Sequence, residues 1–396
     1  MGSILMARRL NDWLDAYVDF CCRVSEPPES FHRWCGISLI AAALQRKCHV
    51  PWGPLTFYPN MYIVIVSPSG RARKGTAVGF YTSFAEDLSL PLAAEAITRE
   101  ALIQALNKTR RSDPLPSGEM DTHSSLTIIS PELTVFLGYN NHQLMSDLTD
   151  WYDCRNKWVY RTKTSTSDEI WGVWVNLFGA TTPELIRTTL PLDAIGGGLT
   201  SRIIFVYEEN KGRICPAPFM TEDDQETRKA LLHDLEQIHI MRGQFKATPT
   251  FLEKWINWYS TEAQVYPFID PKFGGYSERR PNHLMKLSMI ISASRRDSRE
   301  MTGEDFDTAK QYLLDVEKKM PNVFAGMGRL ENADVMQAVL AEINKYDVVD
   351  YQTIMAKFYR DADDSRMQLI IQTLEASGFV KIIRDSRGLM RIKSLH

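Results

Sequence analysis

The sequence predicts an α/β protein with a mainly parallel sheet, followed by a helical segment and a small C-terminal unit. Short apolar runs with the length of buried strands recur through the first half of the chain, and segments of helical periodicity separate them. From about residue 211 the pattern becomes mainly helical. Strands that alternate with helices are typical of a layered α/β sandwich.

The length of 396 residues predicts several domains, because one hydrophobic core stops growing well below that size. We expect an N-terminal helical segment (1–50), an α/β core (51–210), a helical subdomain (211–325) and a C-terminal domain (329–396). The composition, with 44% hydrophobic and 24% charged residues, is that of a soluble globular protein. The formal net charge of -3 excludes a uniformly basic nucleic-acid binder but allows a local basic patch.

The cysteine usage and the hydropathy pattern predict a cytoplasmic protein. The six cysteines show neither the spacing of metal ligands nor the density of a disulfide scaffold. No apolar run approaches the ~18 residues of a membrane span, and the N-terminus lacks the apolar region of a signal peptide. We therefore expect no membrane association.

The elements of the first half follow from local patterns. Apolar residues at helical spacing predict helices over 8–24 and 31–46. The polar stretch 110–125 reads as an exposed connection because it contains many turn formers. Buried strands are expected at 62–66, 126–129, 173–178 and 202–207, and a hairpin at 158–162 and 170–175.

The second half is predicted to contain helices and one hairpin. Helices are expected over 222–242, 249–264, 281–294, 304–319, 332–345, 351–359 and 364–377. Two short strands follow around the turn Asp385-Ser386-Arg387-Gly388. Three helices and a hairpin at the C-terminus predict a winged helix-turn-helix.

The segment 67–76 reads SPSGRARKGT and stands between a predicted strand and a predicted helix, which is the context of a phosphate-binding loop. It departs from the pattern G-x-x-x-x-G-K-[ST], because the Thr comes one place late. Lys74 is placed to neutralise the β- and γ-phosphates, and Thr76 or Ser69 could reach magnesium. The predicted nucleotide-binding residues are Ser67, Pro68, Ser69, Gly70, Arg71, Ala72, Arg73, Lys74, Gly75 and Thr76. The alternative is an ordinary strand-to-helix loop with a solvated Arg/Lys cluster.

Polar residues that follow the other predicted strands are candidate catalytic groups. Glu132 comes after LTIIS, where a carboxylate could orient or deprotonate an attacking water. Asn176, Thr181 and Thr182 follow apolar residues of the next strand and could hold that water. Helix-start roles are the alternatives for Glu132 and for Thr181 and Thr182.

Arg202 begins an apolar strand after a flexible Gly triplet. At the edge of the sheet, its guanidinium could enter the site of a neighbouring subunit as an arginine finger.

In this order and spacing, SPSGRARKGT, IISPE, VNLFGATTPE and GGLTSRIIFV resemble a family of phage and prophage P-loop proteins with variant RKGT loops. These proteins look like the AAA+ clade, near superfamily III and minichromosome-maintenance helicases, and several are attached to primase domains. The resemblance, over about residues 25–295, implies an AAA+ P-loop three-layer sandwich with N-terminal helices, a helical lid and a C-terminal winged helix. ATP and Mg²⁺ are the implied cofactors.

Carried onto this chain, the resemblance assigns roles to single residues. Lys74 and Thr76 form the nucleotide loop, with Thr76 as the metal ligand, and Glu132 is the Walker B glutamate. Asn176 is sensor 1 and Arg202 is the finger. Arg279 or Arg280 resembles sensor 2; a solvated pair at a helix start is the alternative. The usual Walker B Asp is missing, because Ser130 and Pro131 occupy the strand end.

Two basic segments predict contact with DNA. In the resembling clade, a hairpin before the sensor 1 strand grips DNA, and here its basic residues are Lys157, Arg161 and Lys163. The C-terminal hairpin carries Lys381, Arg384 and Arg387. A solvated hairpin tip and a protein-interaction module are the respective alternatives.

These features together predict an ATP-dependent DNA helicase or translocase that works as a homo-oligomeric ring, expected to be a hexamer. Primase or other replication proteins are expected partners. One alternative is a non-translocating ATPase such as a replication initiator or helicase loader. Another is a DNA-binding regulator that has lost hydrolysis.

Overall fold

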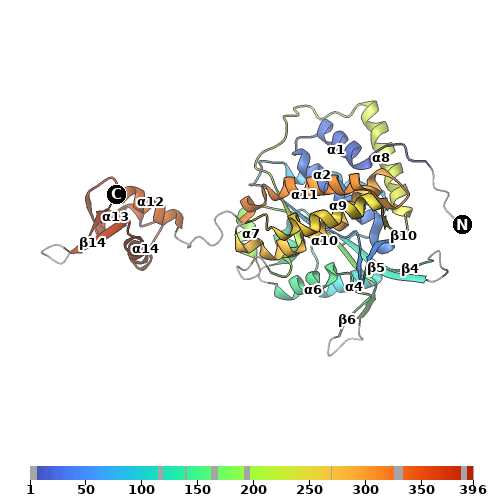
Figure 1. Ribbon diagram of the computed structural model, residues 1–396. Helices are drawn as coiled ribbons and strands as arrows, with labels where there is room; N and C mark the ends of the chain where they lie inside the picture. The colour runs from blue at the N-terminus through green and yellow to red at the C-terminus, as the bar shows by residue number, and fades with distance from the viewer. Residues whose placement is uncertain are drawn as a thin grey trace. The chain divides into compact units, whose positions relative to one another are not determined.

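The computed structural model describes residues 7–114, 118, 120–138, 141–161, 168–190, 197–268, 270–324, 333–384 and 390–395. The chain divides into two compact units, Met1–Ala325 and Gly326–His396 (Figure 1). The first unit is an α/β structure, as predicted. The expected boundaries near residues 50 and 210 both fall inside it.

A five-stranded sheet forms the centre of the first unit, in the order β4-β5-β8-β3-β9. Its strands are β3 (Tyr62–Val66), β4 (Arg110–Pro114), β5 (Met120–Ser130), β8 (Val173–Thr181) and β9 (Ile203–Tyr207). The pairs β5–β8, β8–β3 and β3–β9 are parallel, and only β4 runs antiparallel to its neighbour. Every residue of β3 and β8 is buried, which explains why both strands read as apolar runs.

The stretch 110–125, predicted to be an exposed connection, instead supplies β4 and the first half of β5. Their ladder pairs Arg110 with Ser124 and Pro114 with Met120. The Ser112 and Thr122 hydroxyls are hydrogen bonded across it at 2.9 Å. An edge strand of this kind needs no alternation of apolar and polar residues, because backbone hydrogen bonds and polar side-chain contacts hold it to its neighbour. The prediction failed for that reason.

The N-terminal and the middle segments supply helices that pack on the sheet or on one another. These helices are α1 (Trp13–Val24), α2 (Glu29–Leu44), α3 (Lys74–Asp87), α4 (Arg99–Lys108), α5 (Leu133–Leu137), α6 (His142–Tyr152) and α7 (Pro183–Thr189). Thirteen of the sixteen residues of α2 are buried, because α2 packs against α1, α3, α8 (Glu222–Ile240) and the sheet. A helix that is apolar on all sides and covered by its neighbours in this way is a buried core helix.

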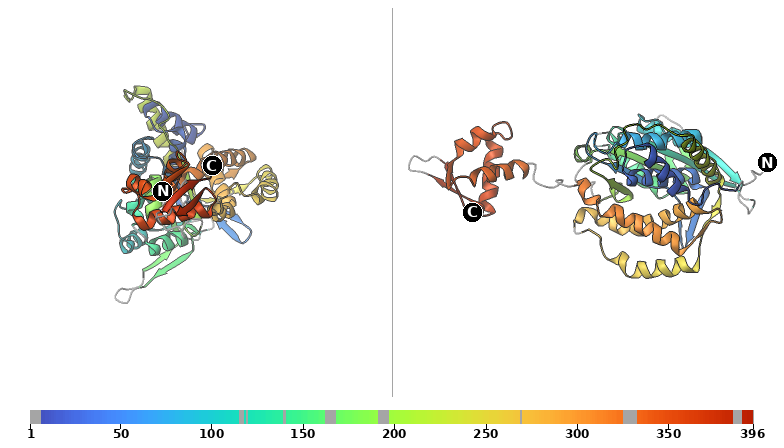
Figure 2. Two further views of the ribbon diagram at one scale, coloured as in Figure 1. Left: turned by 90° about the vertical axis from the view of Figure 1, so that its left-hand side faces the viewer. Right: turned by 90° about the horizontal axis from the view of Figure 1, so that it is seen from above.

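The remaining helices of the first unit are α9 (Pro249–Ser260), α10 (Gly274–Arg295) and α11 (Gly303–Glu317). The yellow α9 lies on the outer side of α11 in the right panel of Figure 2. Helix α10 begins seven residues before the expected start at Pro281 and continues through this proline. A proline in a sequence reads as a helix start, and here it lies inside the helix.

Short strands connect these helices with the rest of the unit. Strand β1 (Cys48–Trp52) pairs with β2 (Leu55–Phe57) and with β10 (Gly243–Gln244), and β11 (Lys246–Ala247) pairs with β12 (Glu300–Met301). The segment 211–325 is therefore not purely helical, and α8 packs on the N-terminal helices α1 and α2. No described helix has the length and apolar character to cross a membrane.

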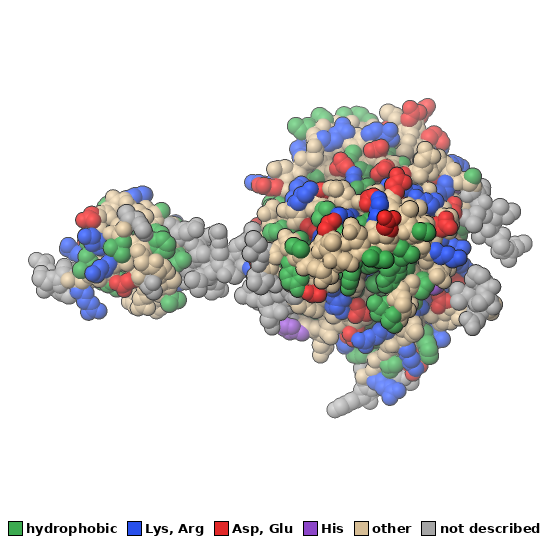
Figure 3. Space-filling view, in the orientation of Figure 1, with side chains coloured by type: hydrophobic (Ala, Val, Ile, Leu, Met, Phe, Trp, Pro, Cys, Tyr) green, Lys and Arg blue, Asp and Glu red, His purple; other side chains and the backbone are tan. Residues whose placement is uncertain are grey.

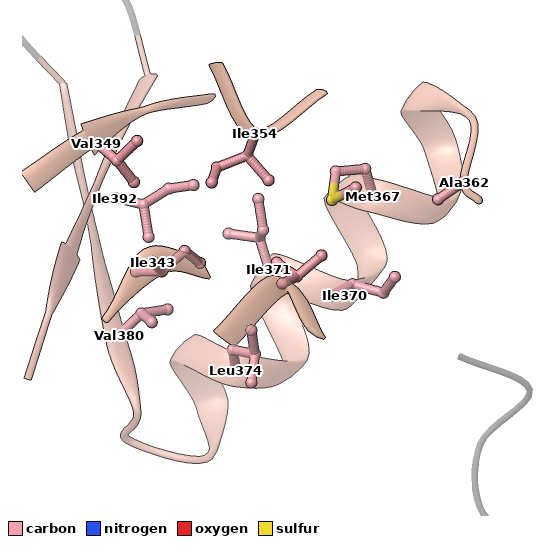
Figure 4. Packing of buried hydrophobic residues seen from close by; sticks show 11 residues of the cluster. Ile343, Val349, Ile354, Ala362, Met367, Ile370, Ile371, Leu374, Val380 and Ile392 are labelled. Carbon is pink, nitrogen blue, oxygen red and sulfur yellow. The ribbon is translucent and has the colours of Figure 1, made fainter. Parts of the chain in front are cut away.

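The second unit contains three helices and a three-stranded antiparallel sheet of order β13-β15-β14. Its elements are α12 (Ala333–Ile343), β13 (Val348–Asp350), α13 (Tyr351–Phe358), α14 (Asp364–Ala376), β14 (Val380–Arg384) and β15 (Met390–Ser394). Ile354, Ile371, Leu374 and Ile392 meet in its core (Figure 4). The predicted turn at 385–388 lies outside the described residues, and strand β13 was not predicted.

Replacement of Ile371 by Ala should destabilise the second unit by about 2–5 kcal/mol, because it leaves a cavity in a small core. Ile371 is fully buried, whereas Leu369 on the same helix is 56% exposed. We expect faster amide hydrogen exchange in α14 of Ile371→Ala than of the control Leu369→Ala. All nine tryptophans precede residue 326, so urea unfolding followed by tryptophan fluorescence should be unchanged. Equal exchange in the two variants would contradict this account of the core.

Candidate functional site

The carboxyl ends of four parallel strands lie side by side along one side of the sheet, which we call the carboxyl edge. Val66 at the end of β3 pairs with Thr181 of β8 and with Tyr207 of β9, and Ser130 of β5 pairs with Gly179. The chain leaves β3 at this edge, between two neighbouring strands that come later in sequence. Ligands of open α/β sheets bind in this position, beyond the carboxyl ends of the strands.

The loop 67–73, which links β3 to α3, has its middle residues exposed. Gly70 has φ +74°, a conformation that favours glycine. A methyl group added to Gly70 or to Gly75 would meet no atom within 4 Å, so the loop faces open space. Arg73 also has a positive φ, of 54°, directly before α3, and its guanidinium binds Glu26 at 2.9 Å.

Lys74 is the first residue of α3, and its side chain folds back over the loop. The ammonium donates hydrogen bonds to the carbonyls of Ser67 (2.7 Å) and Pro68 (3.5 Å). Burial lowers the Lys74 pKa, while the charges of Glu132 and Glu184 act to raise it. The structure thus brings together a lysine, the exposed loop and two carboxylates at the carboxyl edge. This arrangement suits an anion that carries a divalent cation.

Glu132 stands at this edge directly before α5, half-buried. Its carboxylate caps no backbone N–H of that helix and accepts a hydrogen bond from the Thr134 hydroxyl at 3.1 Å. Glu132 is thus the N-cap residue of α5, the helix-start position expected as the alternative, but no backbone N–H of that helix occupies its carboxylate oxygens. The carboxylate is available to a ligand or to water at the edge.

Asn176 lies in the body of β8, five residues before the strand ends, and does not reach the site. Its Oδ1 accepts a hydrogen bond from the Met61 N–H (2.9 Å), and its Nδ2 donates to the Ser38 hydroxyl (3.0 Å). Five strand residues separate it from the edge by about 16 Å. The predicted role as a sensor does not fit this position, because the fully buried amide ties β8 to α2 and to the start of β3.

Thr181 ends β8 and occupies the position at the edge that was expected for Asn176. It is fully buried, its hydroxyl has no hydrogen-bond partner among the described residues, and its carbonyl accepts from the Ser67 N–H at 3.4 Å. Buried hydroxyls without partners are uncommon and are often found where a ligand binds. Thr182 caps α7 through the Leu185 N–H (3.3 Å), which is the helix-start role expected as an alternative.

Arg202 and Arg279 lie together on the opposite side of the sheet, where the parallel strands begin, which we call the amino edge. Arg202 directly precedes β9, and one carboxylate, that of Asp153, binds both guanidiniums at 2.9 and 3.8 Å. Burial lowers the pKa of Arg279, and the charge of Arg202 lowers it further. Since β9 runs parallel to β3, both arginines are a strand length away from Lys74 of their own chain.

Arg280 does not fit its predicted role, because it is buried in the helical layer. It forms an ion pair with Glu317 at 2.7 Å, and both side chains are 5% exposed or less. Its guanidinium also lies over the Trp258 ring. Both partners of this ion pair are buried, so it keeps the Arg280 guanidinium inside the helical layer.

No group of three or more His, Cys, Asp or Glu side chains in the described parts of the chain could hold a metal ion. The hydroxyl of Thr76, the expected metal ligand, belongs to an exposed residue in the first turn of α3. Magnesium would therefore depend on phosphate oxygens for most of its coordination, as is common for this ion.

A hairpin of β6 (Lys157–Tyr160) and β7 (Asp168–Trp171) stands outside the central sheet. The Trp158 ring packs on Trp151, and the Arg99 guanidinium lies over Tyr160, which anchors one face. Lys157, on the other face, pairs with Glu169 at 2.8 Å. Basic side chains gather where this hairpin lies, at the lower end of the unit in Figure 3.

Further basic residues occur at both hairpins. Arg161 is exposed, and Lys163 lies outside the described residues. In the second unit Lys381 and Arg384 are exposed, while Arg387 lies outside the described residues. Lys381 pairs across the strands with Lys393, a juxtaposition of like charges that an anionic partner would relieve.

Asn176→Ala should lower the free energy of unfolding by about 1–3 kcal/mol, because it leaves the buried Met61 N–H without its side-chain partner and removes the hydrogen bonds to Ser38. Thr181→Val, on the same strand, removes a hydroxyl that has no partner in the described parts of the chain and should not destabilise the protein. Urea unfolding followed by tryptophan fluorescence measures both variants. A larger loss in Thr181→Val would show that its hydroxyl is structural.

Comparison of the chain with models of protein families finds no match, and comparison with curated proteins finds none either.

Proposed function

We propose that the first unit binds ATP at the loop 67–76 and hydrolyses it. The observation that carries this proposal is the position of Lys74, which lies over an exposed loop between a buried parallel strand and a helix, beside Glu132. Backbone N–H groups at a helix start and a lysine ammonium are the groups that bind the phosphates of nucleotides. The finer assignment of the fold, an AAA+ P-loop sandwich with a helical lid, belongs to the same proposal.

Hydrolysis requires water to attack the γ-phosphorus while the bond to the β-phosphate oxygen breaks. In this proposal Glu132 accepts the proton of that water, and Thr181, in place of Asn176, orients it. Lys74 neutralises charge on the phosphates. Bound Mg²⁺, held in part by Thr76, would supply charge stabilisation at the phosphates.

Arg202 and Arg279 act on the nucleotide of a neighbouring copy in this proposal. Their place at the far edge of the sheet separates them from their own Lys74, so only a second chain can bring them to a phosphate. Such a contact joins the carboxyl edge of one copy to the amino edge of the next, and contacts of this type close into a ring when the rotation from one copy to the next permits it. By resemblance, the ring is a cytosolic hexamer.

We propose that the protein translocates along DNA. The anchored β6–β7 hairpin presents Lys157 and Arg161, and the second unit, proposed to be a winged helix, presents Lys381 and Arg384. These side chains suit contacts with a phosphate backbone and not with base edges. We therefore favour a helicase or translocase of phage or mobile-element replication, with primase or related proteins as partners.

A hydrolysis-deficient DNA-binding regulator is the second candidate function. Ser130 and Pro131 stand at the end of β5, where nucleotide hydrolases carry an aspartate that helps to hold the metal ion. A non-translocating initiator or helicase loader shares all features of the ATP site. DNA-stimulated hydrolysis with strand separation identifies the helicase, and stimulation without separation identifies the loader.

Neither Lys74→Ala nor Arg202→Ala should hydrolyse ATP alone, but a mixture of the two should. In the mixture, a site with an intact Lys74 can meet a neighbour with an intact Arg202. Release of phosphate measures turnover, and we expect at least a 100-fold loss in each pure variant.

The control for this experiment is Lys108→Ala, a change outside the loop at the end of α4, which should keep full turnover. Full activity of Lys74→Ala would remove the loop from the proposal. A mixture that stays inactive would mean that Arg202 supports the fold through Asp153 and not a neighbouring site.

Replacement of both Lys157 and Arg161 by Ala should weaken binding of an oligothymidylate about tenfold at 0.1 M salt and reduce the dependence of affinity on salt, because two phosphate contacts are lost. ATP binding should stay unchanged. Fluorescence anisotropy measures both ligands. Lys229→Ala together with Lys318→Ala, two exposed lysines elsewhere, is the matched control. Equal loss in the control would show that only overall charge matters.

A further inference from the structure

A cleft opens at the amino edge of the sheet, on the side away from Lys74 and the loop 67–76. It has a volume of about 470 Å³, within the usual range of small-molecule sites. Its walls are the segment 54–58 around β2, the segment 152–156 after α6, and Asn282 and Lys286 of α10. The cleft lies within the first unit. Its lining residue Lys286 contacts Asn60, which stands just before the start of β3, and this contact places the cleft at the amino edge.

Lys286 brings a buried positive charge to this cleft. Its side chain is 5% exposed, and its ammonium donates to Asn60 Oδ1 (2.7 Å) and to the Asn60 carbonyl (3.2 Å). The ammonium also lies over the Tyr152 ring, 3.8 Å from its centroid. No carboxylate in the described structure forms an ion pair with it. Buried charges are normally paired, so this ammonium lacks its usual counter-ion.

The surroundings of Lys286 add to the positive charge. Arg202 and Arg279 lie nearby and share the one carboxylate of Asp153, which also lines the cleft. Burial, with smaller contributions from the charges of Arg279 and Arg202, lowers the Lys286 pKa to about 8, while the charges of Cys154 and Asp153 act to raise it. Three cations thus face one anion at the amino edge, and an added anion would relieve the imbalance.

The remaining lining favours a small ligand with polar groups besides its charge. Asn282 is half-buried, and among the described contacts its amide makes no hydrogen bond. It stands four residues before Lys286 on α10, and Arg279 stands three residues before Asn282, so the three occupy one helix face. Leu55, Phe57 and Tyr58 form an apolar wall on the other side.

We propose that this cleft binds a phosphate-bearing small molecule, with Lys286 and Asn282 as its main contacts. Lysine and arginine bind phosphate through charge-assisted hydrogen bonds, and an amide supplies a further donor. A phosphate here would compete with Asp153 for Arg279, so occupancy of the cleft affects the pair between Asp153 and Arg202. The proposal does not depend on nucleotide binding at the loop 67–76.

Isothermal titration calorimetry of the full chain tests this site, with ADP and inorganic pyrophosphate as the probes. The titrations use Lys74→Ala protein, in which the loop 67–76 lacks the lysine proposed to bind phosphate. We expect one remaining site per chain. Adding Lys286→Met or, separately, Asn282→Ala should weaken binding at least tenfold. Adding the exposed control Lys229→Met should change nothing.

The two probes distinguish the sources of the phosphate. Binding of ADP at least tenfold tighter than pyrophosphate assigns the cleft to a nucleotide, and equal binding assigns it to a free phosphate compound. Absence of binding of both probes overturns the proposal. Binding that persists in both Lys286→Met and Asn282→Ala places the ligand elsewhere and also overturns the proposal.

Discussion

The parallel pairing of β3 with β8 on one side and β9 on the other determines where every candidate group lies. Parallel strands place all their carboxyl ends at one edge and all their amino ends at the other. Lys74, Glu132 and Thr181 therefore meet at one edge, and Arg202 and Arg279 meet at the opposite edge. The buried amide of Asn176 strengthens this order, because it joins β8, α2 and the start of β3 at one point.

The two edges of the sheet carry different chemical groups. The carboxyl edge offers an exposed loop and carboxylates, as a phosphate and metal site requires. The amino edge offers an excess of guanidinium and ammonium groups with one carboxylate between them. A single copy cannot bring the two sets together across the sheet, so the proposed action of Arg202 and Arg279 on a bound nucleotide requires a second copy.

Sequence reasoning identified the buried strands and most helices, because apolar runs and helical periodicity report burial directly. It missed β4, whose polar residues form an edge ladder without an apolar face. It also placed Asn176 near a strand end. The strand continues through Gly179 and Ala180, small residues that do not read as a strand. How far a residue lies from the end of its strand, and at which end of the sheet it lies, depend on how the strands pair. A single sequence does not show this pairing.

The turn into α3 depends on a carboxylate from a distant part of the chain. Glu26, between α1 and α2, binds Arg73, Lys211 and the Cys215 N–H. The hydrogen bond from Lys211, followed by those from Cys215 and Arg73, lowers the Glu26 pKa to about 2. A lowered pKa means that this tie is complete above about pH 4.5 and disappears only as the pH falls toward 2. The left-handed turn at Arg73 is thus held by a charge that neutral and mildly acidic solutions do not remove.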